Sequence, residues 1–290
     1  MDLGCRDGCS RCVRRIHIPG DVQKIGLTAA NPEPESTSYW LYGSAKAETK
    51  RCAIWTRNSA ANASDNASLD LPAVLFDLDG TLIDSVYHHV ITWSVALESA
   101  GVVFAKWKIH RRVGMSGKSF VRELLREMPT KPRVNIEHLE QQHDTRFFRV
   151  IPRLQPLPGA NELLAHLSRH KIRIAIATTG NRKHTEAILK RLKIPAGMPI
   201  LTGDDVEKAK PSPDIFVAAA ESLNANISDC IVVGDSVWDL LAAGRKSALG
   251  VGVLSGGYGE EDLERAGAFR VYSDPSDLLM HIEQLGLPGE

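Results

Sequence analysis

Cysteine is scarce in most of this chain of 290 residues. Four of its five cysteines lie within residues 1–70, and only Cys230 follows them. A framework of disulfide bonds is therefore excluded for the larger, C-terminal part of the chain.

An excess of one charge and long apolar runs are also lacking. Lys and Arg together number 35, as do Asp and Glu, and neither sign collects in a block. No apolar run has the length that spans a bilayer, and the N-terminus lacks the short apolar core of a secretion signal. These absences argue against nucleic-acid and membrane partners, and we expect a soluble, cytoplasmic protein.

Residues 1–70 lack the large aliphatic side chains that build a core. Leu, Ile, Val and Phe account for only ten of these 70 residues. Segments such as NPEPESTS are typical of chains that bury too little apolar surface to fold, so we interpret residues 1–70 as a disordered extension. Acidic residues within it argue against an organelle transit peptide. Because no methionine lies between Met1 and Met115, a native start near residues 69–74 is an alternative.

Three cysteines of this extension follow the spacing Cys5-x3-Cys9-x2-Cys12. The spacing resembles the motif with which radical-SAM enzymes hold an iron–sulfur cluster. Those enzymes need a long α/β barrel after the motif, whereas Ala-, Asn- and Ser-rich sequence without sustained periodicity follows here. The motif lacks its structural context, and we favour the disordered extension.

From residue 71 onward, short apolar runs that end in polar or glycine turns alternate with amphipathic stretches. These apolar runs predict buried parallel strands. They cover Ala73 to Asp77, Ile172 to Ala177, Cys230 to Val233 and Ala248 to Val253. Alternating strands and helices predict an α/β fold with a doubly wound parallel, Rossmann-like sheet. Ligands bind such sheets outside the carboxyl ends of the strands. The residues expected at that edge are Asp77, Asp79, Thr178 and Asp235.

One stretch contains helical patterns and no convincing strand. The first predicted helix starts at an N-cap, Asp84 or Ser85, and ends at Gly101. A second covers about Ser119 to Met128, and a third carries Leu139 and Phe147. We therefore predict an all-helical cap over residues 87–152, inserted into an α/β core formed by residues 71–86 and 153–290.

Four motifs in a fixed order carry a resemblance to a known family. They are FDLDGTLIDS with Asp77 and Asp79, IAIATTGNR with Thr178, KAKPSPDIF with Lys210, and GDSVWD with Asp235 and Asp239. Together they resemble the haloacid dehalogenase-like (HAD) superfamily, most of whose members are phosphotransferases. The resemblance runs from residue 71 to about residue 286. Thr178 is favoured over Thr179 because it directly follows the apolar run, and Lys210 over Lys208 because it precedes Pro211.

The residue types suit phosphoryl transfer from a monoester. That reaction needs an in-line nucleophile, a proton donor for the leaving oxygen, and cations around the equatorial oxygens. Asp77 is the candidate nucleophile and would form an aspartyl phosphate. Asp79 would protonate the leaving alkoxide and then activate water.

The resemblance implies the remaining roles. Mg²⁺ would bind Asp77, the backbone carbonyl of Asp79, and Asp235, with support from Asp239; a magnesium ion keeps several waters and needs few protein oxygens. Thr178 would donate to the phosphoryl group, and Lys210 would neutralise its charge. Asp239 has an alternative role as the cap of its helix.

Within the superfamily, Asp79 argues against true dehalogenases and phosphonatases, which lack the second acid. The helical insertion resembles the small cap of the phosphoglycolate phosphatase and β-phosphoglucomutase branch, whose cap residues choose substrates. His89 aligns with a histidine of that branch that helps to time the acid, or else faces the core beside Trp93. The basic residues Arg111, Arg112 and Lys118 would form a cationic lip, and Thr179 is a further candidate for substrate binding.

The sequence thus predicts a Mg²⁺-dependent phosphatase for a small phosphorylated metabolite such as phosphoglycolate or a sugar phosphate. A sugar phosphomutase is the alternative, because the same residues would return the phosphoryl group to the substrate if water were excluded. A catalytically silent ligand-binding module is the second alternative. Whether the chain is a monomer or a dimer stays open.

Overall fold

A computed structural model describes residues 71–129 and 132–289 of the chain. The expectations for residues 1–70, including the cysteine motif and the alternative start, lie outside the described residues. None of the helices in the described ranges is long and apolar enough to cross a membrane.

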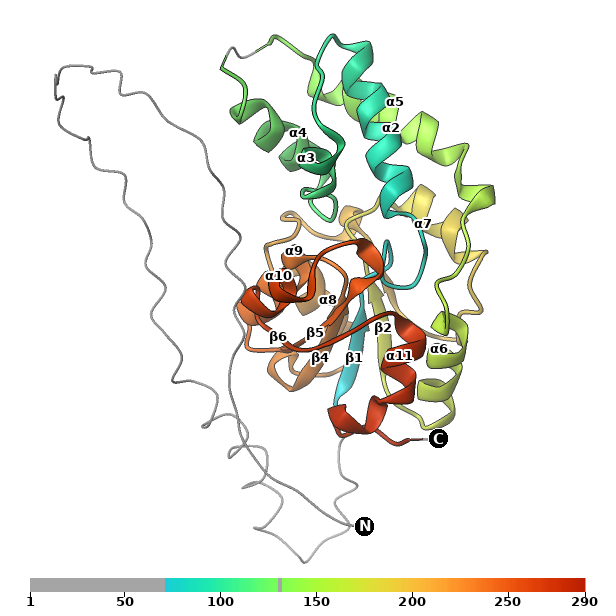
Figure 1. The fold of residues 1–290 in the computed structure, drawn as a ribbon. Coiled ribbons are helices and arrows are strands. Elements are labelled where there is room, and N and C mark those ends of the chain that lie inside the picture. The colour runs from blue at the N-terminus through green and yellow to red at the C-terminus, as the bar shows by residue number, and fades with distance from the viewer. Residues whose placement is uncertain (1–70, 130–131, 290) are drawn as a thin grey trace, which may run out of the picture. The chain divides into compact units, whose positions relative to one another are not determined.

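The described part of the chain contains a sheet of six parallel strands in the order β3-β2-β1-β4-β5-β6 (Figure 1). The strands are β1 (Ala73–Phe76), β2 (Ile174–Ala177), β3 (Ile200–Leu201), β4 (Cys230–Gly234), β5 (Leu249–Val253) and β6 (Ala268–Tyr272). The predicted doubly wound parallel sheet is therefore confirmed. Two strands escaped prediction: β3 has only two residues, and the outer strand β6 exposes Phe269 and Arg270 instead of forming a buried apolar run.

Helices cover both faces of the sheet because the strands are apolar on both sides. Val74 and Phe76 of β1 pack on α6, α7 and α11, whereas Ala73 and Leu75 pack on α8 and α9. The core helices are α6 (Ala160–Arg169), α7 (Arg182–Leu189), α8 (Asp214–Ser222), α9 (Val237–Gly244), α10 (Glu260–Arg265) and α11 (Pro275–Met280). This arrangement fixes the strands so that their carboxyl ends share one edge.

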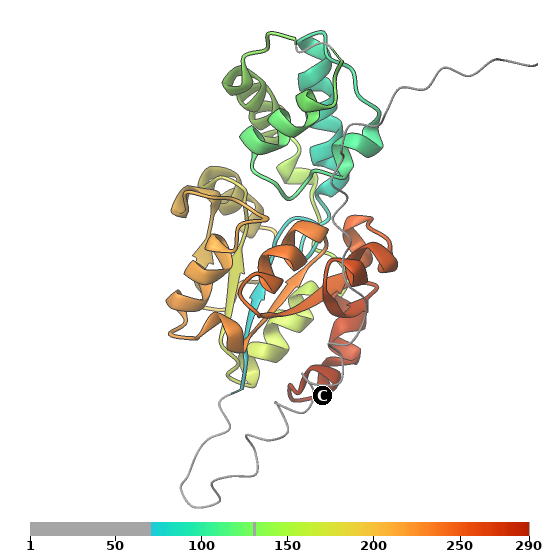
Figure 2. The same cartoon turned by 90° about the vertical axis from the view of Figure 1, so that its left-hand side faces the viewer.

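Four helices lie between β1 and α6: α2 (Val86–Ser99), α3 (Lys106–His110), α4 (Gly117–Arg126) and α5 (Ile136–Phe148). They are called the cap below. They pack around a hydrophobic cluster of their own that includes Trp93, Leu97, Phe120 and Leu124. Figure 2 shows them gathered at one end of the sheet. The short helix α3 has only five residues and was not predicted from the sequence.

The chain enters and leaves the cap through two neighbouring segments, residues 82–84 and 155–157. The backbone N–H of Asp84 donates to the carbonyl of Gln155 at 3.0 Å, and that of Leu157 donates to Leu82 at 3.0 Å. These are called the crossing segments below. They tie the two ends of the cap to each other.

Candidate active site

Three neighbouring strands end in the polar residues that the sequence singles out. Asp77 follows β1, Thr178 follows β2 and Asp235 follows β4. The backbone N–H of Asp77 donates to the carbonyl of Val233 at 2.9 Å, and that of Thr178 donates to Leu201 at 3.0 Å, so the sheet ladder reaches both residues. Because β2, β1 and β4 are adjacent and parallel, the three side chains meet at one edge.

Asp77, Asp235 and Asp239 form a buried acidic cluster. Each offers a carboxylate oxygen, and these atoms all lie within 4.8 Å of one another. Burial and the neighbouring carboxylates raise the pKa of Asp77 to about 7, although Lys210 acts in the opposite direction. Burial and the charges of Asp239 and Asp77 also raise the pKa of Asp235 well above its ordinary value. The negative charge in this cluster is incompletely balanced, and three hard oxygen donors fit a divalent cation.

Two glycines make room for Asp235. Gly80 has φ +84°, a conformation that side chains other than glycine rarely adopt. A Cβ atom at Gly80 would lie 2.6 Å from Oδ2 of Asp235, and a Cβ atom at Gly256 only 1.7 Å from it. The carboxylate therefore occupies space that any larger residue at either position would fill.

Lys210, not Lys208, reaches the acidic cluster. Its side chain is 1% exposed, and its ammonium group donates to Asp77, to the carbonyl of Ala177 at 3.1 Å and pairs with Asp239 at 2.7 Å. Burial alone would lower the pKa of Lys210, but the carboxylates of Asp239 and Asp77 raise it above its ordinary value. The group is a fixed positive charge beside Asp77.

Asp239 caps its helix, one of the two roles considered for it, and also contacts Lys210. Its Oδ2 accepts from the hydroxyl of Ser236 at 2.6 Å and from the Ser236 backbone N–H at 3.2 Å, which caps α9. Its other oxygen faces Lys210. The helix cap therefore also aims a carboxylate at the acidic cluster.

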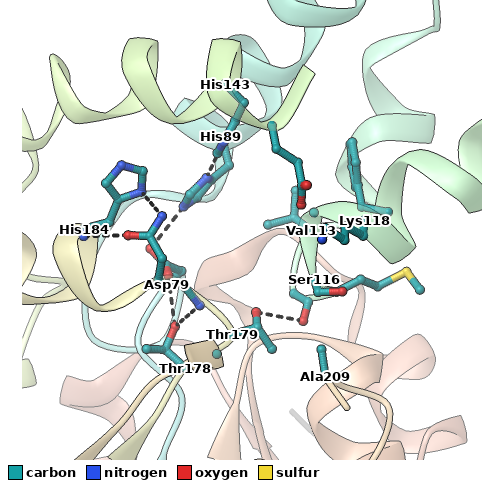
Figure 3. A pocket seen from close by; sticks show the side chains of 18 of the residues that line it. Asp79, His89, Val113, Ser116, Lys118, His143, Thr178, Thr179, His184 and Ala209 are labelled. Atoms are coloured by element: carbon teal, nitrogen blue, oxygen red, sulfur yellow. Dashed lines mark hydrogen bonds and ion pairs between the residues drawn. The ribbon is translucent and has the colours of Figure 1, made fainter. Parts of the chain in front are cut away.

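Asp79 lies on the side of the site nearest the cap (Figure 3). Its Oδ1 accepts from the hydroxyl of Ser85 at 2.6 Å and lies 3.3 Å from Nε2 of His89, and its Oδ2 accepts from Thr178 at 3.4 Å. Burial alone would raise the pKa of Asp79, but the contacts with His89 and Ser85 hold it below its ordinary value. Ser85 does precede α2, as expected, yet its side chain makes no helix cap and binds Asp79 instead.

A cavity of about 680 Å³ opens between these residues and the cap. Lys118 and Thr179 line it, together with His89 and Thr178. The hydroxyl of Thr179 donates to the carbonyl of Gly114 at 3.2 Å, so it links the core to the cap. Five acids that the sequence did not single out also line the cavity: Glu137, Glu140, Asp144, Asp204 and Glu207.

The predicted cationic lip is reduced to Lys118. Arg112 is not among the residues that line the cavity; its guanidinium pairs with Glu127 and donates to the carbonyl of Lys108. Arg111 pairs with Asp262 of the core at 3.0 Å. Both arginines therefore find carboxylate partners in the protein, which charge clusters in loops often do.

A group of polar residues beside Asp79 was missed. His143, Asp144, Asn181 and His184 all line the cavity, and His143 lies 3.1 Å from His89 (Figure 3). In the sequence His143 falls on the apolar stripe of its helix, where it reads as a packing residue. The sequence offers one indication of a role in the site: a histidine, His143, stands on this apolar stripe one turn before Phe147.

Known proteins are similar to this chain in sequence and in fold. A model of the haloacid dehalogenase-like hydrolases matches residues 71–245. β-Phosphoglucomutase of Bacillus subtilis (strain 168) is 29% identical over 219 residues, which cover 73% of this chain and 93% of that protein. Hexitol phosphatase A of Escherichia coli (strain K12) is 31% identical over 189 residues, which cover 59% of this chain and 78% of the relative.

Among solved structures, a hydrolase from Pseudomonas syringae is 45% identical to this chain and superposes with a TM-score of 0.70. The match covers 74% of this chain and 98% of that one.

Proposed function

Because this chain belongs to the haloacid dehalogenase-like hydrolases, we propose that it is a Mg²⁺-dependent phosphatase that hydrolyses a small phosphomonoester. The pair Asp77 and Asp79 carries this proposal. The two carboxylates follow the same strand, yet one lies in the buried acidic cluster beside Lys210 and the other faces His89 and Ser85. Such a division gives a nucleophile and an acid/base at one site.

In the first step a carboxylate oxygen of Asp77 attacks phosphorus, and the bond from phosphorus to the leaving oxygen breaks. For this step Asp79 must be protonated, against the lowering of its pKa by His89 and Ser85 in the substrate-free site; it gives the proton to that oxygen, which departs as an alcohol. In the second step Asp79, now a carboxylate, takes a proton from water, and the water oxygen attacks phosphorus. The bond to Asp77 breaks, and phosphate leaves with Asp77 restored.

The neighbouring residues hold the reacting groups. Lys210 fixes Asp77 and places a positive charge beside the phosphoryl oxygens. Thr178 keeps its hydroxyl at the cavity wall, where a phosphoryl oxygen can replace Asp79 as acceptor. Mg²⁺ would bind Asp77 and Asp235, with Asp239 beside them, and would neutralise charge on the transferring group.

The charge of the cavity favours one kind of substrate. Among the described residues, Lys118 is the one lysine or arginine that lines the cavity. Besides the acids of the sheet edge, five acids line it: Glu137, Glu140, Asp144, Asp204 and Glu207. A leaving group with its own carboxylate is repelled there, whereas an uncharged polyol is not. We therefore favour a sugar or polyol phosphate over phosphoglycolate.

The test is phosphate release with Mg²⁺ across sugar phosphates, polyol phosphates, phosphoglycolate, nucleotides and pyrophosphate. Asp77→Asn is expected to abolish release, because an amide is a poor nucleophile. Asp84→Asn, a matched change at an exposed aspartate seven residues further on, is expected to retain it.

Release that persists in Asp77→Asn would contradict the aspartyl-phosphate mechanism. Conversion of β-glucose 1-phosphate to the 6-phosphate without release would show a phosphomutase. Mg²⁺-dependent ligand binding without turnover would favour a silent binding module.

A further inference from the structure

A line of polar contacts leads from Asp79 into the cap, and the two-step mechanism does not use it. Nε2 of His89 lies 3.3 Å from Oδ1 of Asp79, and Nδ1 of His89 lies 3.1 Å from Nε2 of His143. Nδ1 of His143 lies 3.1 Å from Oδ1 of Asp144. Two imidazoles in series therefore connect the carboxylate of Asp79 with that of Asp144.

Aromatic packing holds both imidazoles in place. His89 stacks on Phe147 with ring centroids 3.7 Å apart, and His143 stacks on Trp93 at 4.2 Å. His89 and Trp93 lie four residues apart on α2, as do His143 and Phe147 on α5, so each pair faces the other helix. Either ring would have to leave this stack in order to turn.

Asp144 determines which nitrogen of each imidazole donates and which accepts. A carboxylate only accepts hydrogen bonds, so Nδ1 of His143 carries a proton and donates to Asp144. Burial lowers the pKa of His143 to about 4, which keeps its ring neutral and makes Nε2 an acceptor. Nδ1 of His89 must then donate to His143. Nε2 of His89 therefore accepts the proton of Asp79 when that acid is protonated, and donates to the Asp79 carboxylate when the His89 ring carries both protons.

The core in turn holds Asp144. Nδ2 of Asn181 donates to Oδ2 of Asp144 at 3.2 Å, while Oδ1 of Asn181 accepts from the backbone N–H of His184 and caps α7. Asn181 comes three residues after Thr178, in the loop that follows β2. The line of contacts therefore leaves the core at Asp79, passes through α2 and α5, and returns to the core beside the next strand.

We propose that Asp144 and His143 are positioning residues that orient the imidazole of His89 toward Asp79 while α5 is seated on the core. The proposal rests on the role given to Asp79 in the proposed function. Both residues act through His89, by deciding which of its nitrogens meets Asp79.

The first test is Asp144→Asn in the full chain, a change of nearly equal size at a side chain that is 42% exposed. His143 and Asn181 donate to different oxygens of Asp144, and an amide keeps only one of the two as an acceptor, so the variant loses one of these contacts. We expect kcat for phosphate release to fall about tenfold with little change in KM, the scale on which partners of a functional imidazole act. The ring ¹⁵N shifts of His143 should also leave the values of the Nδ1–H tautomer, and those of His89 should change with them.

A second test exchanges the amide of Asn181 in the core with the carboxylate of Asp144 in the cap. Asn181→Asp keeps a helix-capping side chain but sets two carboxylates against each other, so we expect a similar loss of kcat. In the double variant, Asn181→Asp with Asp144→Asn, the amide at position 144 donates to the carboxylate at position 181. The amide oxygen at position 144 then remains as an acceptor for His143. We expect kcat to recover to within about threefold of wild type, which loss of helix structure alone would not allow. His138→Gln, at an exposed position on the same helix, is the control and should change nothing.

Unchanged kcat and unchanged ring shifts in Asp144→Asn would overturn the proposal. A change in KM alone would also overturn it, because Asp144 would then be a substrate-binding group. If wild type released no phosphate from any substrate, the proposed function would fail instead. The ring shifts of His89 and His143 would still decide whether Asp144 sets their tautomers.

Discussion

Asp235 carries the least compensated charge among the acids at the sheet edge. Lys210 contacts Asp77 and Asp239, whereas the side chain of Asp235 accepts a hydrogen bond from the hydroxyl of Thr81 at 3.2 Å. Ionised Asp235 therefore lies buried beside two other carboxylates. Its folded-state pKa is raised, as is that of Asp77, so both groups hold their protons more tightly in the folded protein than in the unfolded chain.

This shift predicts how the stability of the metal-free protein depends on pH. Unfolded aspartates lose their protons near pH 3.8, whereas folded Asp77 does so near pH 7 and Asp235 also well above 3.8. Between these values the unfolded chain binds fewer protons, so stability falls as the pH rises through this window. Asp235→Asn should raise the stability at pH 8 in EDTA on the order of 2 kcal/mol, a typical cost of an uncompensated buried group, and change little at pH 4.

Thermal unfolding followed by circular dichroism checks this expectation. Added Mg²⁺ should raise the melting temperature of wild type at pH 8 but have little effect on Asp235→Asn. A variant that is less stable than wild type in EDTA at pH 8 would contradict the sign of the predicted shift.

The position of some site residues could be predicted from the sequence, and that of others could not. Asp77, Thr178 and Asp235 directly follow apolar runs, and parallel strands end at one edge, so their proximity follows from the pattern. The contact between His89 and His143 joins residues 54 positions apart on two helices of the cap. Only the packing of α2 against α5 creates that contact, and no local pattern encodes it.

At the scale of single elements, the apolar spacing predicts the longer cap helices correctly but does not predict the shortest elements. The helices α2, α4 and α5 follow apolar spacing with a clear start or stop. The strand β3 and the helix α3 have two and five residues, too few for any period to emerge. Their place is decided by neighbours: β3 pairs with β2, and α3 packs against α2.

Helix α11 offers a test of capping that is independent of the chemistry. Oδ1 of Asp274 accepts from the backbone N–H groups of Ser276 at 2.8 Å and Asp277 at 3.0 Å. Asp274→Ala should lower the free energy of unfolding by about 1 kcal/mol, while Asp274→Asn should change it by only a few tenths, since Asn caps nearly as well. Urea denaturation measures both, and equal losses in the two variants would show that the cap is not the cause. Phosphate release should be the same in all three proteins.

At the scale of the whole molecule, cap and core together build the charged wall of the cavity. Glu137 and Glu140 come from α5, whereas Asp204 and Glu207 come from the loop after β3. Burial raises the pKa of Glu140, although Lys118 opposes the shift. The selectivity of the cavity therefore depends on both parts of the chain.

Three phosphoesters of similar size test this selectivity: phosphoethanolamine, 2-hydroxyethyl phosphate and phosphoglycolate. Their leaving groups carry a positive charge, no charge and a negative charge. We expect kcat/KM for phosphoglycolate to be at least about fivefold below that for the uncharged ester, since one unfavourable charge contact costs on the order of 1 kcal/mol or more. High salt should narrow this difference in kcat/KM, because it screens the repulsion between the carboxylates.

Glu140→Gln should narrow the difference in kcat/KM as well. Glu123→Gln should not, because this half-buried carboxylate of α4 pairs with Arg126 and does not line the cavity. Phosphoglycolate as the best of the three substrates would refute the electrostatic explanation while leaving the phosphatase mechanism intact.

The crossing segments have a consequence for how such a protein can change over generations. Residues 82–84 and 155–157 are hydrogen-bonded to each other, so the cap begins and ends at nearly the same point of the core. A helical insertion of any length fits at this point without displacing a strand, because its two ends need only be neighbours. The cap is in this sense an exchangeable module: a different one, joined at the same two segments, would give the same carboxylates a new choice of substrate.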